Sequence, residues 1–116
     1  MPELEEITNK IIDFRDKRDW QQFHNPKDLA LSLVLEASEV LEHFQWKNGT
    51  ELNKYIDSNK DLISQELADV LYWVLLMSKD LDINIIQALE AKLKINEEKY
   101  PIEKSKGKAD KYTKLN

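Results

Sequence analysis

Apolar and polar residues alternate along most of the chain with the period of an α-helix. The first periodic stretch runs from about Glu3 to Arg18, with apolar side chains at positions 4, 7, 11 and 14. Three further stretches run over about 26–46, 60–79 and 82–100. The pattern predicts an all-α chain of four helices. An antiparallel four-helix bundle is the assembly that such helices favour.

Polar residues and helix breakers mark the expected helix ends. Asn25 followed by Pro26 is typical of an N-cap and a first helical residue. The run Lys47-Asn48-Gly49 is typical of a helix C-terminus, so the second helix should end near Trp46. Ser58-Asn59-Lys60-Asp61 resembles a capping box and should open the third helix. The residues around LNKYI between these signals are predicted to form a short polar connection.

The second and third helices each carry an acidic pair at spacing i, i+3. Glu36 and Glu39 lie on a narrow stripe of the second helix, with leucines on both sides of it. Glu66 and Asp69 share one face of the third helix, whose other faces are mostly Leu, Val and Ile. If the two helices pack antiparallel with these stripes facing, four carboxylates converge. His43 shares the stripe of the second helix, but an outward-facing histidine is the favoured interpretation.

Converging carboxylates need a compensating positive charge, because ionised groups are rarely buried without one. Mg²⁺ prefers oxygen ligands and usually binds through a few carboxylates together with substrate phosphates. The alternative is two solvated acidic faces, which is the usual meaning of a single i, i+3 pair. Two such pairs in apolar surroundings place the two interpretations about level. The residues alone therefore leave a magnesium site as one of two hypotheses.

Composition and charge narrow the class of protein. The chain has 116 residues and no cysteine, which excludes disulfides, thiolate zinc sites and cysteine nucleophiles. No signal-like start and no bilayer-length apolar run is visible, so we expect a cytoplasmic protein that does not bind membranes. Residues 1–102 have a net charge of −8 (12 basic, 20 acidic) and residues 103–116 a net charge of +3 (five basic, two acidic). We therefore predict an acidic helical domain with a mobile basic tail, unsuited to duplex nucleic acid.

Several motifs resemble one known family in the same order along the chain. Glu36-Ala-Ser-Glu39 and Glu66-Leu-Ala-Asp69 resemble the ExxE and ExxD signature of the MazG-like nucleoside triphosphate pyrophosphohydrolases. The segments RDWQQFHNP and FQWK are similar to those of the dCTP pyrophosphatase branch of that family. The ending of the fourth helix, with Lys92, Asn96 and Tyr100-Pro101, and the tail motif KYT are also similar.

The resemblance implies a fold, a reaction and an assembly. It implies helical protomers that form a homo-oligomer, either a dimer or a tetramer, and cleave a nucleoside triphosphate to the monophosphate and pyrophosphate with Mg²⁺. Glu36, Glu39, Glu66 and Asp69 would be the metal ligands. Glu39 is also the candidate general base, although the sequence does not separate the two roles.

The same resemblance implies the substrate contacts. Lys92 and Asn96 would bind phosphates, while the nucleobase would lie against Trp20, His24 and Trp46. Trp73 is also a predicted substrate contact. It stands where the dCTP-hydrolysing members usually have tyrosine, so we expect a pocket that accepts several bases. We expect deoxynucleoside triphosphates as substrates, with dCTP or a modified dCTP among the best. Phe23 and Phe44 are expected in the core.

Two other classes of protein fit parts of the pattern. A non-catalytic helical interaction module would use the acidic stripe to bind a basic partner. A di-iron carboxylate bundle would need Glu-x-x-His pairs, and neither acidic pair is followed by histidine at that spacing. Release of pyrophosphate only in the presence of Mg²⁺ distinguishes the enzyme from the interaction module.

Overall fold

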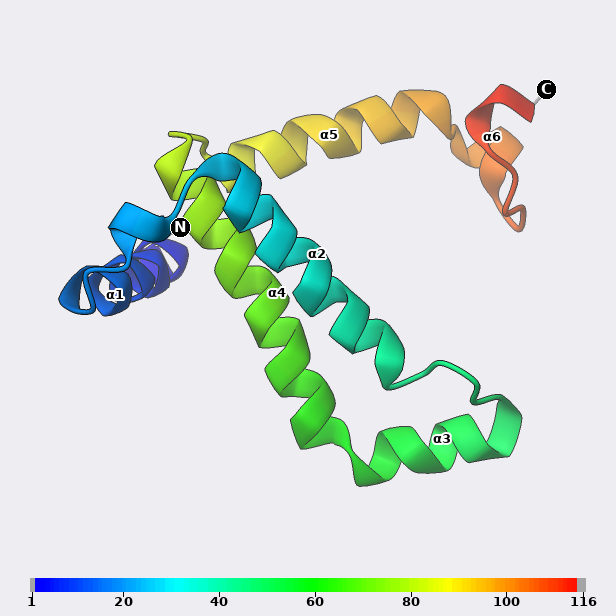
Figure 1. Ribbon diagram of the computed structural model, residues 1–116. Coiled ribbons are helices and arrows are strands. Elements are labelled where there is room, and N and C mark those ends of the chain that lie inside the picture. Colours follow the sequence, from blue (N-terminus) through cyan, green and yellow to red (C-terminus); the bar gives the residue numbers. More distant parts are fainter. Residues whose placement is uncertain (1, 115–116) are drawn as a thin grey trace. The chain divides into compact units, whose positions relative to one another are not determined.

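The computed structural model describes residues 2–114, in which every regular element is helical (Figure 1). The prediction of an all-α chain is therefore confirmed. The helices are α1 (Pro2–Lys17), α2 (Pro26–Glu42), α3 (Gly49–Ser58), α4 (Lys60–Asp80), α5 (Ile85–Lys99) and α6 (Ile102–Ser105), with 3-10 turns at Gln21–Phe23 and Tyr112–Lys114. The chain forms two compact units that divide between Asp82 and Ile83.

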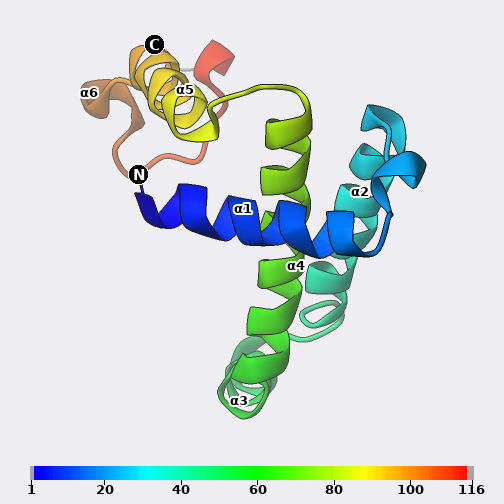
Figure 2. The same cartoon turned by 90° about the vertical axis from the view of Figure 1, so that its left-hand side faces the viewer.

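The first unit, up to Asp82, is built on a hairpin of α2 and α4 and is called the hairpin unit. These two helices run side by side in opposite directions, with α3 between them in the sequence (Figure 1). Helix α1 lies across α4 (Figure 2). The antiparallel packing of α2 against α4 is the arrangement that brings the two acidic pairs toward one another.

The core of this unit lies where α1 meets the hairpin. Its buried apolar side chains are Ile11, Leu29, Leu75 and Leu76. Full burial of a leucine side chain contributes about 1.5–3 kcal/mol, so a few such residues can hold the three helices together. Beside them, Arg15 is 2% exposed and donates two hydrogen bonds to Asp80, of 2.7 and 2.8 Å. This bidentate ion pair joins the end of α1 to the end of α4.

The ends of α2 and α3 differ from the sequence prediction. Helix α2 stops at Glu42, and the next four residues form turns that end at Trp46, whose φ is 69°. Gly49 does not end α2. With a φ of 56°, it is the first residue of α3. The segment predicted as a polar connection is therefore a helix, because its apolar residues Leu52, Tyr55 and Ile56 are spaced to turn inward on one face.

Both predicted helix starts are correct, but only one of the two predicted caps forms. Asn25 caps α2 as expected: its side-chain oxygen accepts a hydrogen bond from the Asp28 amide at 2.9 Å. The predicted capping box is wrong, because Ser58 still belongs to α3 and Asn59 makes no side-chain cap. The Asn59 amide group instead donates to the carbonyl oxygen of Tyr55 at 2.9 Å, which ties α3 to the start of α4.

The second unit contains α5, α6 and the 3-10 turn of residues 112–114. Asn84 caps α5 by accepting a hydrogen bond from the Gln87 amide at 3.1 Å. In the basic segment, Tyr112 packs edge-on against Tyr100 with a ring-centroid distance of 6.0 Å, and Lys99 lies 4.8 Å from the Tyr112 ring centroid. The segment predicted as a mobile tail, as far as it is described, thus contacts the end of α5 through Tyr112.

Of the four helices expected to form a bundle, α1, α2 and α4 pack in the first unit, and α5 belongs to the second. Across residues 2–114, no helix combines the length and the apolar character needed to cross a lipid bilayer.

Candidate active site

Three carboxylates meet between α2 and α4. Glu36 and Glu39 come from adjacent turns of α2, and Glu66 comes from α4. One carboxylate oxygen of each residue lies within 4.8 Å of those of the other two. The i, i+3 spacing on α2 and the antiparallel course of α4 are together what produces this acidic cluster.

The carboxylates of the cluster disfavour one another's ionisation. Partial burial raises the pKa of Glu36 to about 7, with further contributions from a hydrogen bond to Glu39 and from the charges of Glu39, Asp69 and Glu66. The pKa of Glu66 is also raised, first by a hydrogen bond with Glu39 and then by burial. No ion pair within residues 2–114 reaches these three side chains. The cluster therefore has an excess of negative charge.

The cluster fits a hard divalent cation. Atom Oε2 of Glu36 and atom Oε2 of Glu66 are both buried without a hydrogen-bond partner, which is costly for a carboxylate oxygen. Mg²⁺ holds its ligands at about 2.0–2.1 Å, so two of them lie at most about 4 Å apart around one ion. The observed limit of 4.8 Å is slightly wider, and small side-chain rotations suffice to close it. All the donors are oxygens, as Mg²⁺ prefers.

Asp69, the fourth predicted ligand, lies outside the group of three but next to it. Its charge contributes to the raised pKa of both Glu36 and Glu66. It is exposed, and together with Glu36 it lines a cavity of about 500 Å³. Asp69 therefore joins the acidic cluster to this cavity.

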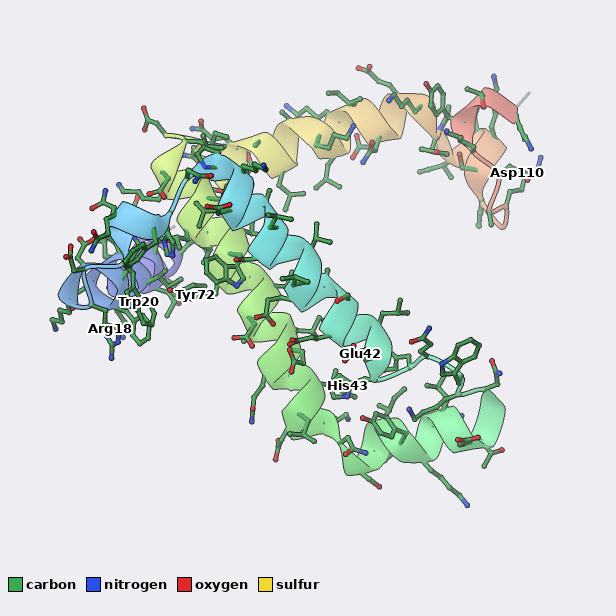
Figure 3. The ribbon with its side chains drawn as sticks, viewed as in Figure 1. Arg18, Trp20, Glu42, His43, Tyr72 and Asp110 are labelled. Carbon is green, nitrogen blue, oxygen red and sulfur yellow. The ribbon has the colours of Figure 1, made fainter. Side chains whose placement is uncertain are left out.

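The other lining residues are mostly aromatic, and they come from α1, from the loop after it and from α4. Its lining residues are Lys10, Ile11, Phe14, Trp20, Glu36, Asp69, Tyr72 and Trp73. The Phe14 ring meets Trp20 edge-on at 5.8 Å and Tyr72 edge-on at 6.4 Å. Trp20 and Tyr72 both lie where α1 meets α4 (Figure 3). A flat ring could stack against such a wall.

His24 does not line the cavity itself, but it contacts Trp73, which does. The two rings meet edge-on at 5.7 Å. Burial lowers the pKa of His24, and the positive charge of Arg15 lowers it further. His24 is thus neutral at pH 7, and its buried Nδ1 has no partner. The structure therefore places three of the predicted substrate contacts, Trp20, Trp73 and His24, at this wall, and their role in binding stays a prediction.

Trp46, Lys92 and Asn96 are the other three predicted substrate contacts. Trp46 is 88% exposed and does not line the cavity. Lys92 is exposed and Asn96 half-buried on α5 in the second unit. Phe23, expected in the core, is 66% exposed, so that prediction is wrong, while Phe44 is half-buried. The apolar contacts of Phe23 expected from the pattern are not made, because the residue stands in a short 3-10 turn outside the helix faces.

Sequence analysis missed several residues of the site. Phe14 and Tyr72 were visible only as apolar positions on helices, and nothing in their spacing distinguishes a cavity wall from a core. Lys10 was indistinguishable from an ordinary surface lysine.

His43 was misjudged as outward-facing. It is half-buried, and its Nδ1 lies 2.6 Å from the hydroxyl oxygen of Tyr55 on α3. His43 lies at the end of α2 far from Trp20 (Figure 3).

Known enzymes resemble this chain over most of its length. The sequence model of the MazG-like family matches residues 31–115, which include both acidic pairs. The chain is 38% identical to dCTP pyrophosphatase 1 of Mus musculus and 34% identical to that of Homo sapiens, in each case over 98% of this chain and 68% of the relative. The crystal structure of a pyrophosphatase from Archaeoglobus fulgidus superposes with a TM-score of 0.81 at 38% identity, covering 85% of this chain and 93% of that one.

The family match extends over most of the chain, and the curated relatives and the solved structure are enzymes of one reaction class. The resemblance seen in the sequence motifs is confirmed. The protein is a hydrolase that acts on phosphoric anhydrides, and it belongs to the MazG-like family.

Proposed function

We propose that the protein is a Mg²⁺-dependent pyrophosphohydrolase that converts deoxynucleoside triphosphates to monophosphates and pyrophosphate, with dCTP or a modified dCTP preferred. The observation that carries this proposal is an unneutralised acidic cluster that opens onto an aromatic cavity through Glu36 and Asp69. The relatives named dCTP pyrophosphatase 1 support the choice of substrate. In the cytoplasm, such an activity would clear unwanted nucleotides from the pool.

The roles of the carboxylates follow from their positions. Glu36, Glu39, Glu66 and Asp69 would hold the metal, since the three glutamates form the acidic cluster and Asp69 lines the cavity together with Glu36. Bound Mg²⁺ would neutralise phosphate charge and lower the pKa of a bound water molecule. Glu39 is exposed to solvent beside the two partly buried glutamates, so it is the best placed to accept the proton of the attacking water.

The aromatic wall would bind the nucleobase. Trp20 and Trp73 offer flat faces beside the carboxylates, and neutral His24 can donate or accept one hydrogen bond at the polar edge of a base. Discrimination between bases depends on polar groups that stay unpaired with the wrong one. A site with a single histidine edge should therefore prefer a base without excluding the others.

We also propose that the active form is a homo-oligomer, a dimer or a tetramer. Large apolar side chains of α2 and α4 remain more than half exposed in the single chain, namely Leu31, Val34, Leu35, Leu41, Leu62, Leu67 and Leu71. An exposed apolar surface of this extent is typical of a protein–protein interface. In this assembled form, the nucleotide would also contact Trp46, Lys92 and Asn96, which are not among the cavity's lining residues.

Pyrophosphate release from a panel of natural and modified nucleoside triphosphates, with and without Mg²⁺, tests the proposal. Release from deoxynucleotides with Mg²⁺, and none after chelation, is the expected result. A chain that releases no pyrophosphate from any nucleotide with Mg²⁺ would instead favour the non-catalytic interaction module. Purine ribonucleotides as the best substrates would contradict the assignment of the base pocket.

The aromatic wall has its own test in Trp20→Ala. This change should weaken nucleotide affinity much more than it weakens Mg²⁺ binding, because Trp20 lines the cavity but offers no oxygen to hold the metal. Phe23→Ala is the matched control, since Phe23 is a nearby aromatic residue that is 66% exposed and outside the cavity lining. Equal affinities of wild type and Trp20→Ala would show that the base binds elsewhere.

A further inference from the structure

The cavity contains a positive charge that the sequence motifs do not account for. Lys10 of α1 lines the same hollow as Glu36 and Asp69, and it is the one basic side chain among the lining residues that the structure describes. Ile11 and Phe14 of the same helix line the cavity as well. Positions i and i+4 of a helix lie on one face, so the face of α1 that carries Phe14 also carries Lys10.

The ammonium group of Lys10 is not engaged by the neighbouring acidic residues of α1. Asp13, three residues away, pairs with Lys17 at 2.8 Å. Arg15 forms an ion pair with Asp80, and its Nε lies 4.0 Å from a carboxylate oxygen of Asp16. Among the ion pairs of residues 2–114, none includes Lys10. Its charge is therefore available to a ligand in the cavity.

The charge of the proposed substrate calls for such a group. A nucleoside triphosphate bound at Glu36, Glu39, Glu66 and Asp69 brings further negative charges to carboxylates that no ion pair within residues 2–114 neutralises. One or two Mg²⁺ ions would neutralise only part of the combined charge. A lysine at the cavity wall lowers the electrostatic cost of binding an anion there.

We propose that Lys10 binds the phosphate groups of the substrate nucleotide. This inference rests on the proposed function and adds to it a phosphate contact from α1, separate from Lys92 on α5. A lysine suits the task, because its flexible stem can lie along the Phe14 side of the cavity while the ammonium group reaches a phosphate oxygen. Phe14 itself is 42% exposed and so presents a surface for that stem.

The test is direct binding of a non-hydrolysable dCTP analogue, measured by titration calorimetry with Mg²⁺ at low and at high salt. Lys10→Met removes the charge and keeps the length of the side chain, and Lys10→Arg keeps the charge. A charged hydrogen bond contributes about 1.5–3 kcal/mol, so Lys10→Met should weaken binding about tenfold or more at low salt. The loss should shrink at high salt, since salt screens exposed charges, and Lys10→Arg should recover most of the affinity.

Lys17→Met is the matched control, because Lys17 is an exposed lysine of the same helix whose partner is Asp13 and which does not line the cavity. It should bind the analogue as the wild type does. Wild-type affinity in Lys10→Met, or a loss that does not change with salt, would overturn the role of Lys10 while leaving the proposed function intact. A wild type that does not bind the analogue at all would overturn the proposed function itself.

Discussion

The hairpin unit contains two groups of partly buried charged residues, and only one of them is neutralised by the chain itself. At the junction of α1 and α4, buried Arg15 meets Asp80 in a bidentate pair, and the charges cancel. Between α2 and α4, the carboxylates of Glu36, Glu39 and Glu66 lie together, and no basic side chain within residues 2–114 pairs with them. The first arrangement is complete within the chain, whereas the second requires something from outside it.

The difference separates structure from chemistry. The Arg15–Asp80 pair helps to fix how α1 crosses the hairpin, and its two charges are neutralised within the chain. An unpaired cluster beside a cavity costs free energy in the absence of a cation, and that cost is removed when one binds. The following predictions test this contrast, beginning with the largest expected effect.

Glu39→Gln should lower turnover by about 10²–10⁴-fold, the usual contribution of a general base, while helix content stays the same. Pyrophosphate release at saturating Mg²⁺ and circular dichroism measure the two quantities. Glu42→Gln is the matched control on the same helix, because Glu42 is exposed and outside the acidic cluster. Near-normal turnover of Glu39→Gln would remove Glu39 from the catalytic site.

Asp80→Leu should lower the free energy of unfolding by about 3 kcal/mol, because it leaves the buried Arg15 guanidinium without its partner. Denaturant unfolding provides the measurement. The double variant Arg15→Leu/Asp80→Leu should recover much of the loss, since no unpaired charge remains. Asp13→Asn, which breaks the exposed pair with Lys17, should cost only about 0.3–0.5 kcal/mol.

The metal-free protein should lose stability as the pH rises from about 4.5 to 7. In this window, folded Glu36 keeps its proton, since its pKa is about 7, whereas the unfolded chain releases it near 4.5. Unfolding then releases a proton and becomes easier at higher pH. Thermal melting measures this loss: between pH 4.5 and 7, the melting temperature should fall more steeply with pH in the wild type than in Glu36→Gln. Added Mg²⁺ should raise the melting temperature of the wild type at pH 7. If the melting temperatures of the two proteins change identically with pH, Glu36 does not have a raised pKa.

Tyr55→Phe should have the smallest effect, a loss of about 1 kcal/mol in the free energy of unfolding, because one hydrogen bond to His43 disappears. This bond joins α3 to the end of α2, away from the buried core. Denaturant unfolding measures the loss. Asp57→Asn on the exposed face of α3 should be silent, and an equal loss in both variants would show that the bond with His43 is not what stabilises α3.

The sequence by itself determined which segments are helical and which carboxylates share a face. Helical periodicity and the cap at Asn25 depend on neighbours within about one helical turn, so they can be predicted without knowledge of the tertiary structure. The same holds for the i, i+3 spacing of Glu36 and Glu39. The short helix α3 was missed because its ten residues offer few helical repeats, and its stability depends on packing against α4.

Only the tertiary structure decided which of these residues meet. The pairing of Arg15 with Asp80 spans 65 positions, and no local pattern announces it. The crossing of α1 over α4 likewise made a cavity wall of Lys10, Phe14 and Tyr72, which on a helical wheel look like surface or core. Contacts between residues distant in sequence depend on how helices pack, and that is decided by the summed burial of many side chains rather than by any single one.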